Sequence, residues 1–395
     1  MELSRGEFIG MAGGAGVAAM LGLLPEQAQA HTNLPPSVTD AITHRVYDGV
    51  HGWTNWLRRN GVRGYFCETS WPNGAEGPRL YADGTSDIPQ WNTLGRKVYS
   101  WLDAADVWAT YWTAAATSGT SIFKVYTPTD FTVPYAKRVI NHAYGQAAVI
   151  EAHPSTVYYK RGVNANGGEL RLGIEDTFSN QNPGVYGQNY AYPIRASFDY
   201  LASRGHKVIR LPFRWERLQP TLYKSLSSVE LGRLKTCVAA ARAEGLGIIL
   251  DPHNFGEYRV SGGVRKIGTP ALPISAFKDL WMRLSRQFKD VPGIAGYQLM
   301  NEPRLMPGKA PVWEKASQAA VNAIRANGDK QRLMVAGYFE REGIQGNGVF
   351  TFVANHPTAW IKDPLRKVFY TTHGYWARSG STYNDTNAYW KTEGY

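Results

Sequence analysis

The chain has 395 residues, of which 43% are hydrophobic and only 19% charged, and its formal net charge is +11. This composition, without a Gly-X-Y period or a sustained heptad repeat, excludes collagen-like, coiled-coil and disordered chains. The length fits either one large α/β barrel or two ordinary domains. The 13 tryptophans indicate either a large core or a protein that binds flat apolar faces, because indole rings are common platforms for sugars and bases.

The positive charge is dispersed, since no run of Lys or Arg is longer than two residues. Such a distribution is typical of the solvated surface of a secreted protein. We favour that interpretation over the alternative, which is binding to acidic cell-wall polymers or to nucleic acid.

Residues 1–30 have the pattern of a secretory signal peptide, with a glycine-diluted apolar segment over 8–24 and a small-residue cleavage site at 28–30. The apolar segment is too short for a membrane span. Residues 4–9 resemble a twin-arginine signal without its second arginine, so a Sec route and an atypical twin-arginine route both stay open. We predict a secreted, extracellular protein with no membrane segment after cleavage, and a loose N-terminal tail over 31–44.

From residue 45 onward, helix-like and strand-like segments alternate. The first helix ends at Asn60-Gly61 and leads into a strand over 62–66. A second helix, over about 91–102, leads into a strand over 107–112, and the segment 134–150 has helical character. The apolar stripe of the first helix consists of Val46, Val50, Trp53 and Leu57.

Six further strands follow, and helices separate most of them. Strands that alternate with helices indicate parallel βα units, and eight such units can close a barrel without an exposed edge. The sequence therefore predicts one (β/α)8 TIM barrel over residues 45–395. The six strands are expected at 157–163, 207–213, 247–252, 294–300, 333–337 and 367–372.

The reacting groups of a βα barrel lie at the carboxyl ends of its strands. In this chain those ends carry two carboxylates, Glu68 and Glu302. A pair of carboxylates flanking a bond, one ionised and one protonated, is what cleavage of a glycosidic bond needs. The other polar and aromatic side chains expected at these ends are Trp71, Trp112, Asn164, Asn166, Arg210, Arg214, Asp251, His253, Asn254, Asn301, Tyr338, His373 and Tyr375.

Four segments at these strand ends strongly resemble glycoside hydrolase family 5, the large cellulase family: 207–220, 248–254, 297–303 and 373–375. They occur in the family's order, and the resemblance covers about 157–395. It implies a retaining hydrolase of β-linked polysaccharide, most often an endo-β-1,4-glucanase, that needs no cofactor or metal and acts as a monomer. Mannanase, xyloglucanase and β-1,3-glucanase activities stay open as alternatives, as does an inactive carbohydrate-binding barrel.

The family's seventh and eighth strands, with the nucleophilic Glu and a stacking Trp, are expected after the His-x-Tyr strand. In this chain, segments 56–69 and 106–112 resemble them and come first. We therefore predict a circularly permuted barrel in which 45–130 supplies family strands seven and eight and 157–395 supplies strands one to six. The alternative, an unrelated front module and a six-stranded barrel fragment, would leave two open parallel edges.

By the resemblance, Glu302 is the general acid/base and Glu68 the nucleophile, with carboxyl groups about 5–5.5 Å apart in a retaining enzyme. Arg210 and Tyr375 would hold the Glu68 carboxylate. Asn301 would bind the 2-hydroxyl of the sugar being cleaved. Cys67 stands where the family commonly has Gly before the nucleophile.

His253 and His373 would line the same subsite, and Trp112 would form its floor. A metal site at Asp251, His253 and His373 lacks the closely spaced ligand pairs of metal motifs, so we expect none. We also predict no disulfide, because Cys67 and Cys237 would lie on opposite sides of the barrel. Tryptophans expected to extend the cleft are Trp71, Trp215 and Trp376, and those expected to pack in the core are Trp53, Trp91 and Trp281.

Overall fold

The computed structural model describes residues 40–74, 79–118, 121, 123–341, 344–345, 348–376 and 382–392. The predicted signal peptide and residues 31–39 of the predicted tail lie outside this part of the chain. The remainder of the tail prediction is wrong, because residues 41–44 form the first turn of α3 (Ala41–Asn60). Asp40 begins this helix, since its carboxylate accepts the backbone N–H of Thr43 at 2.7 Å.

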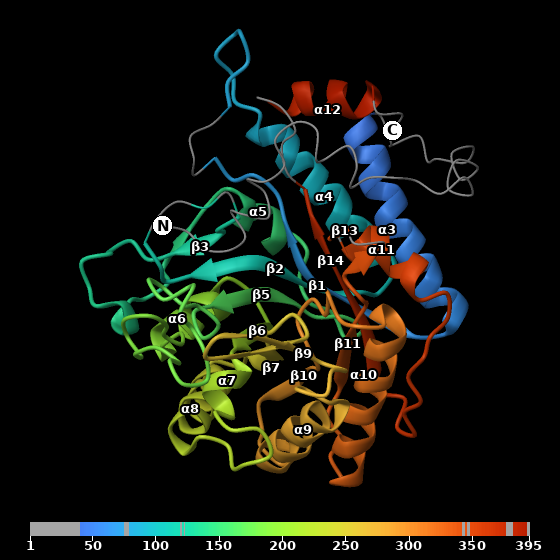
Figure 1. Ribbon diagram of the computed structural model, residues 1–395. Coiled ribbons are helices and arrows are strands. Elements are labelled where there is room, and N and C mark those ends of the chain that lie inside the picture. The colour runs from blue at the N-terminus through green and yellow to red at the C-terminus, as the bar shows by residue number, and fades with distance from the viewer. Residues whose placement is uncertain are drawn as a thin grey trace.

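In the part of the chain that the structure describes, eight parallel strands form a closed barrel (Figure 1). Neighbours in the barrel follow one another along the chain, and β14 closes the ring by pairing with β1 in parallel. This arrangement confirms the predicted (β/α)8 barrel. The strands are β1 (Arg63–Ser70), β2 (Trp108–Ala115), β5 (Arg161–Asn166), β6 (Val208–Phe213), β7 (Gly247–Pro252), β10 (Ile294–Gln298), β11 (Leu333–Ala336) and β14 (Val368–Tyr375).

Helices surround the strands and cover them from solvent (Figure 1). The predicted stripe of α3 is buried against the barrel, with Val46 and Trp53 both 0% exposed. The other helices are α4 (Ile88–Ala104), α5 (Gln146–Glu151), α6 (Arg195–Ser203), α7 (Trp215–Leu218), α8 (Ser228–Ala243), α9 (Ile274–Phe288), α10 (Lys309–Ala326), α11 (Gly348–Asn355) and α12 (Tyr383–Thr392).

The segment 134–150 differs from the predicted helix. It contains a single 3-10 turn at Tyr135–Lys137, the strand β4 (His142–Ala143) and only then α5. The strand β4 pairs with β3 (Tyr126–Thr127), which extends the sheet beyond β2. Within this segment, therefore, only residues from 146 onward are α-helical, whereas 142–143 are bonded to a neighbouring strand.

Two hairpins on the loops after barrel strands were not predicted. They consist of β8 (Glu257–Val260) with β9 (Gly263–Lys266), and of β12 (Glu340–Arg341) with β13 (Ile344–Gln345).

The first and last described helices lie side by side (Figure 1). The amide oxygen of Asn387 on α12 accepts the backbone N–H of Ala41 at 2.8 Å. Tyr383 donates its hydroxyl to Asp40 at 3.1 Å. The two ends of the described chain are thus hydrogen-bonded to each other.

Both cysteines are free and buried, which confirms the prediction of no disulfide. Cys67 lies on β1 with its sulfur 3.6 Å from the backbone oxygen of Thr372, and Cys237 lies on the outer helix α8. Among the described helices, none is both long enough and apolar enough to cross a membrane.

Candidate active site

Glu68 lies near the carboxyl end of β1, directly after an irregularity in the pairing of β1 with β14. Such an irregularity re-aims the side chains that follow it. The Glu68 side chain is 0% exposed, and Arg210 donates Nη1 to its Oε1 at 2.5 Å. Tyr375 donates its hydroxyl to the other carboxylate oxygen. Both oxygens of Glu68 are therefore held by donors from other strands.

Arg210, on β6, joins four strands of the barrel. Its Nη1 also donates to the amide oxygen of Asn164 at 2.8 Å, and its Nη2 donates to Asn301 at 2.7 Å. The same Nη2 is 2.9 Å from a carboxylate oxygen of Asp251. Burial opposes the charge on Arg210, but the carboxylates of Asp251 and Glu68 outweigh burial and raise its pKa, so the guanidinium stays a cation.

Asn301 and His253 form a chain of hydrogen bonds that fixes both side chains. Asn301 accepts from Arg210, so its amide nitrogen faces His253 and donates to Nε2 at 3.2 Å. The Nδ1 of His253 then donates to Asp251 at 2.8 Å. This network assigns a neutral His253 with its proton on Nδ1. Burial raises the pKa of Asp251 to about 7, although Arg210 opposes this effect.

Glu302 follows β10 and has a φ of 37°, in the left-handed region that non-glycine residues rarely adopt. Backbone strain of this kind is concentrated at functional sites. The side chain is 5% exposed, His373 lies with Nδ1 2.8 Å from its Oε1, and Arg304 lies 3.6 Å from its Oε2.

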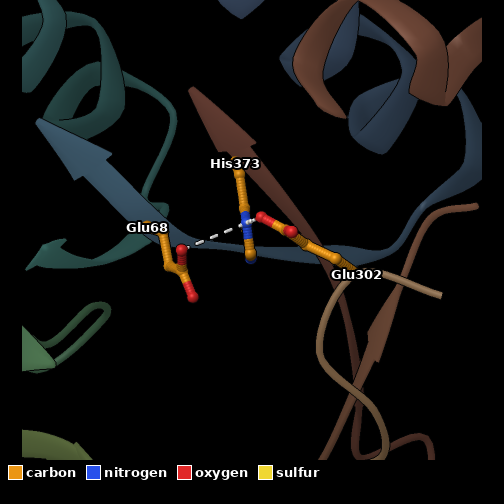
Figure 2. A group of neighbouring side chains, drawn as sticks. All are labelled: Glu68, Glu302 and His373. Carbon is orange, nitrogen blue, oxygen red and sulfur yellow. Dashed lines mark hydrogen bonds and ion pairs between the residues drawn. The ribbon is translucent and has the colours of Figure 1, made fainter. Parts of the chain in front are cut away.

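The carboxylates of Glu68 and Glu302 point toward each other, with the ring of His373 between them (Figure 2). One oxygen of each glutamate and one ring nitrogen of His373 all lie within 4.8 Å of one another. The Nδ1 of His373 is 3.4 Å from Glu68 as well as 2.8 Å from Glu302. The two predicted catalytic carboxylates are therefore brought together at the carboxyl end of the barrel.

Burial alone would lower the pKa of His373, but the neighbouring Cys67 sulfur, the Glu68 carboxylate and the hydrogen bond to Glu302 raise it to about 10. The two carboxylates thus favour the protonated ring of His373. One atom from each of the three groups lies close enough to the others to hold a cation.

Trp112, near the end of β2, is 7% exposed and lies over His253, with ring centroids 5.4 Å apart and an angle of 20° between the planes. Its ring thus faces the network of Asn301, His253 and Asp251. Its role as the floor of a sugar site stays a prediction.

The prediction that three further tryptophans extend the cleft is wrong. Trp71 and Trp215 are 0% exposed and Trp376 is 1% exposed. The indole nitrogens of Trp71 and Trp215 are bound inside the protein, to Asn92 and Gln219. Of the tryptophans predicted to pack in the core, Trp53, Trp91 and Trp281 are all 0% exposed, as expected.

Three polar residues have contacts in the site that the sequence analysis did not assign. Asn164 accepts from Arg210 and donates to the backbone oxygen of Cys67 at 2.9 Å, which ties β5 to β1. Asp251 supports Arg210 and His253, and Arg304 lies beside Glu302. Their positions at strand ends were the available signal, but only the fold shows which atoms they contact.

A family model described as Cellulase (glycosyl hydrolase family 5) matches residues 163–394. The Probable endo-beta-1,4-glucanase B of Neosartorya fischeri is 29% identical over 245 residues, which are 62% of this chain and 68% of that protein. The Endo-beta-1,4-glucanase B of Aspergillus niger is 30% identical over 59% of this chain and 63% of that protein.

Among solved structures, Pseudomonas stutzeri endoglucanase Cel5A in complex with cellobiose is 33% identical, with a TM-score of 0.46. The match covers 54% of this chain and 59% of that one. The chain thus spans about three fifths to two thirds of the length of these three proteins. Because the family model covers more than half of the residues, the chain belongs to glycosyl hydrolase family 5.

Proposed function

We propose that this protein is a retaining endo-β-1,4-glucanase that uses Glu68 and Glu302. The observation that carries the proposal is the approach of the two carboxylates to within 4.8 Å. Inverting enzymes need carboxyl groups about 6.5–9.5 Å apart to admit a water, whereas retaining enzymes have them about 5–5.5 Å apart. The separation therefore favours attack by a carboxylate.

In the first step an oxygen of Glu68 attacks the anomeric carbon, and the bond from that carbon to the glycosidic oxygen breaks. The leaving oxygen takes the electron pair and a proton from the Glu302 carboxyl group, which receives that proton from the ring of His373 across the 2.8 Å hydrogen bond. Arg210 and Tyr375 favour the ionised form of Glu68 by charge and by hydrogen bonds.

In the second step the Glu302 carboxylate takes a proton from water, and the water oxygen attacks the anomeric carbon from the face that the leaving group vacated. The ester bond to Glu68 breaks, and its electron pair returns to the carboxylate. Two displacements at one carbon give overall retention.

The fixed amide of Asn301 supports its proposed role in binding the sugar 2-hydroxyl, because Arg210 and His253 hold its oxygen and nitrogen in known orientations. Donors fixed before the substrate arrives need no reorganisation during the reaction. Trp112 would stack on the sugar that is cleaved.

We also propose that the barrel is circularly permuted and that residues 45–395 form one domain. The family match begins at residue 163, yet β1 and β2 lie before it and complete the barrel. Glu68 comes from β1 and Trp112 from β2, so residues 45–130 would supply family strands seven and eight. The hydrogen-bonded pair α3 and α12 supports new ends at one place on the surface.

The names of the relatives favour β-1,4-glucan over mannan, xyloglucan or β-1,3-glucan as the substrate.

Residues 1–30 support export, so the substrate would be met outside the cell. An inactive barrel that only binds carbohydrate is the competing class.

Variants of Glu68 and Glu302 distinguish an active retaining enzyme from an inactive carbohydrate-binding barrel. Glu68→Gln should lower hydrolysis of a soluble β-1,4-glucan more than about 10⁴-fold, because no nucleophile is left. Glu302→Gln should lower it about 10²–10⁴-fold but should spare an aryl glycoside whose leaving group needs no proton. The matched control is Asp199→Asn on the exposed face of α6, which should leave the rate unchanged.

NMR of the first product gives the anomeric configuration. Inversion would exclude the retaining mechanism, and a parent protein without hydrolysis on any β-glucan would exclude the enzyme. An unchanged rate in Glu68→Gln would exclude the permuted site while leaving the family assignment intact.

A further inference from the structure

Basic side chains gather at the amino-terminal end of the barrel, opposite the carboxylates. Arg332, Lys367 and Arg63 precede or begin β11, β14 and β1, which are consecutive strands of the barrel. The pairing of Leu333 with Val368 places Arg332 and Lys367 at the same level. All three side chains are exposed, and Lys160, half-buried, precedes β5.

Three of these cations, Arg63, Arg332 and Lys367, lie in line with side chains that point into the barrel. Tyr65, Met334 and Phe369 belong to the apolar cluster inside its amino-terminal end. Side chains two residues apart on a strand share a face, so Arg63, Arg332 and Lys367 extend those three rows outward.

Two of the cations lie on the aromatic rings that close this end of the barrel. The guanidinium of Arg332 is 5.6 Å from the ring centroid of Trp108, and that of Arg63 is 5.9 Å from the ring of Phe369. Trp108 is on β2, so Arg332 reaches toward it from a strand that is not its neighbour. Arg63 and Arg332 therefore lie over the rings that close this end, whereas the ammonium groups of Lys160 and Lys367 donate to the backbone oxygens of Thr156 and Lys330.

This concentration of charge is not neutralised within the described part of the chain. The side-chain nitrogens of these four cations form no ion pair with a carboxylate there, although the backbone N–H of Lys367 donates to Asp363 at 2.9 Å. The adjacent Arg161, by contrast, is paired with Asp103 at 2.5 Å. The acidic side chain on the corresponding row of β2 is Asp106, which is exposed. Exposed like charges on neighbouring strands repel each other weakly in water, and an anion that binds there relieves this repulsion.

Two exposed side chains with apolar surface lie beside the cations. Val157 is 86% exposed and Tyr158 is 63% exposed. The backbone oxygen of Tyr158 accepts the indole N–H of Trp108 at 3.3 Å. Tyr158 therefore lies at the rim of the aromatic plug, by which we mean the rings of Trp108 and Phe369 that close this end of the barrel. An exposed tyrosine ring is a surface on which a sugar ring stacks.

We propose that this basic mouth, formed by Arg63, Lys160, Arg332, Lys367 and Tyr158, binds a carboxylated polysaccharide. Arg332, Lys367 and Arg63 come from three consecutive strands, so several carboxylates of one uronate chain can meet cations of this group. Tyr158 supplies the stacking surface for a sugar of the same chain. Because the basic mouth and the carboxylates lie at opposite ends of the barrel, the protein can hold an acidic matrix polymer while the other end binds glucan; this last role rests on the proposed function.

Affinity electrophoresis of the full chain in gels containing polygalacturonate tests the proposal. The triple variant Arg63→Gln, Arg332→Gln and Lys367→Gln should weaken retardation at least tenfold, and it should lower the dependence of binding on salt. The matched triple Lys235→Gln, Lys278→Gln and Lys315→Gln removes the same charge from the outer helices α8, α9 and α10 and should bind as the parent does. Thermal unfolding checks that both triples are folded.

A second variant separates recognition of sugar from attraction by charge. Tyr158→Ala should weaken binding to polygalacturonate about threefold to tenfold while leaving the salt dependence unchanged. Activity on a neutral soluble β-glucan should be unchanged in this variant and in both triples, so the outcome for the basic mouth does not depend on the outcome for Glu68 and Glu302.

Three results would overturn the proposal. The first is no retardation of the parent protein by polygalacturonate at low salt. The second is an equal loss of binding in both triples, which would assign binding to net charge alone. The third is tighter binding of single-stranded nucleic acid than of polygalacturonate at the same salt, which would assign the surface to a different polymer.

Discussion

At the carboxyl end of the barrel, Arg210 is fully buried and paired with the buried carboxylates of Glu68 and Asp251, whereas at the amino end Arg63 and Lys367 are exposed and their side chains form no ion pair in the described part of the chain. Strand β1 contributes to both ends, with Glu68 at one and Arg63 at the other. The two ends of the barrel differ in how far water reaches their charged side chains. Where water is excluded, a charge interacts strongly with its partner and pKa values move; where water is present, charges act weakly and over a longer range.

The largest effect should come from breaking the buried network. Arg210→Met leaves the carboxylates of Glu68 and Asp251 buried without their cation, which should cost about 3–5 kcal/mol of the free energy of unfolding. Activity should fall about 10³-fold, because Glu68 and Asn301 lose the donor that orients them. Urea unfolding and kcat/KM measure the two losses.

The control for this variant is Arg195→Met, which removes an arginine whose side chain is 71% exposed and paired with Glu244. It should change neither stability nor activity measurably. Equal losses in the two variants would contradict the contrast between buried and exposed charge.

Two tryptophans on β2 allow the two ends of the barrel to be compared on a single strand. Trp108 and Trp112 are four residues apart, and both are less than 10% exposed. Trp108→Ala should cost about 3–5 kcal/mol of stability through the cavity left in the aromatic plug. It should leave kcat/KM unchanged at a temperature well below unfolding. Trp112→Ala should lower kcat/KM about tenfold at that temperature, because the stacking surface for the sugar is lost. Loss of activity in Trp108→Ala alone would reverse the assignment.

The protonation of His373 provides a pH test of the carboxyl end. Its pKa is raised from 6.5 to about 10 in the folded protein, so folding favours the protonated form. The stabilisation is fully present below about pH 6.5 and is lost as the pH rises through about 10. The difference in unfolding free energy between the parent and His373→Gln should therefore shrink between pH 7 and pH 10. A difference that stays constant over this range would show that His373 is not a cation in the folded state.

Much of this architecture could be predicted because each part leaves a local pattern. The apolar stripe of α3 and the eight strand-like runs follow from periodicity, and Glu302 and Glu68 stand where those strands end. The segment 134–150 was misassigned because its helical pattern competes with sheet bonds to β3, which only tertiary structure supplies.

The tryptophans show the same limit of local patterns. Trp71, Trp215 and Trp376 follow strand ends just as Trp112 does, but their rings turn into the protein, where Trp71 lies edge-on to Tyr111 and Trp215 edge-on to Tyr258. The direction of a side chain beyond the end of a strand depends on the backbone of the loop, which strand alternation does not determine. Likewise the dispersed charge in the sequence concealed the basic mouth, since its residues are brought together only by closure of the barrel.

The smallest expected effect concerns repulsion at the amino end. Lys367 is exposed, and the bond that its ammonium donates to the backbone oxygen of Lys330 is a single one at 3.1 Å. Lys367→Gln should raise the free energy of unfolding by a few tenths of a kcal/mol at low salt, because one of the neighbouring cations is removed. The gain should disappear at about 0.5 M salt, where the screening length is only about 4–5 Å. Lys278→Gln on α9 should show no gain at either salt concentration. A loss of stability in Lys367→Gln at low salt would mean that the bond to Lys330 outweighs the repulsion, and the cations of the basic mouth would then need no anion to balance them.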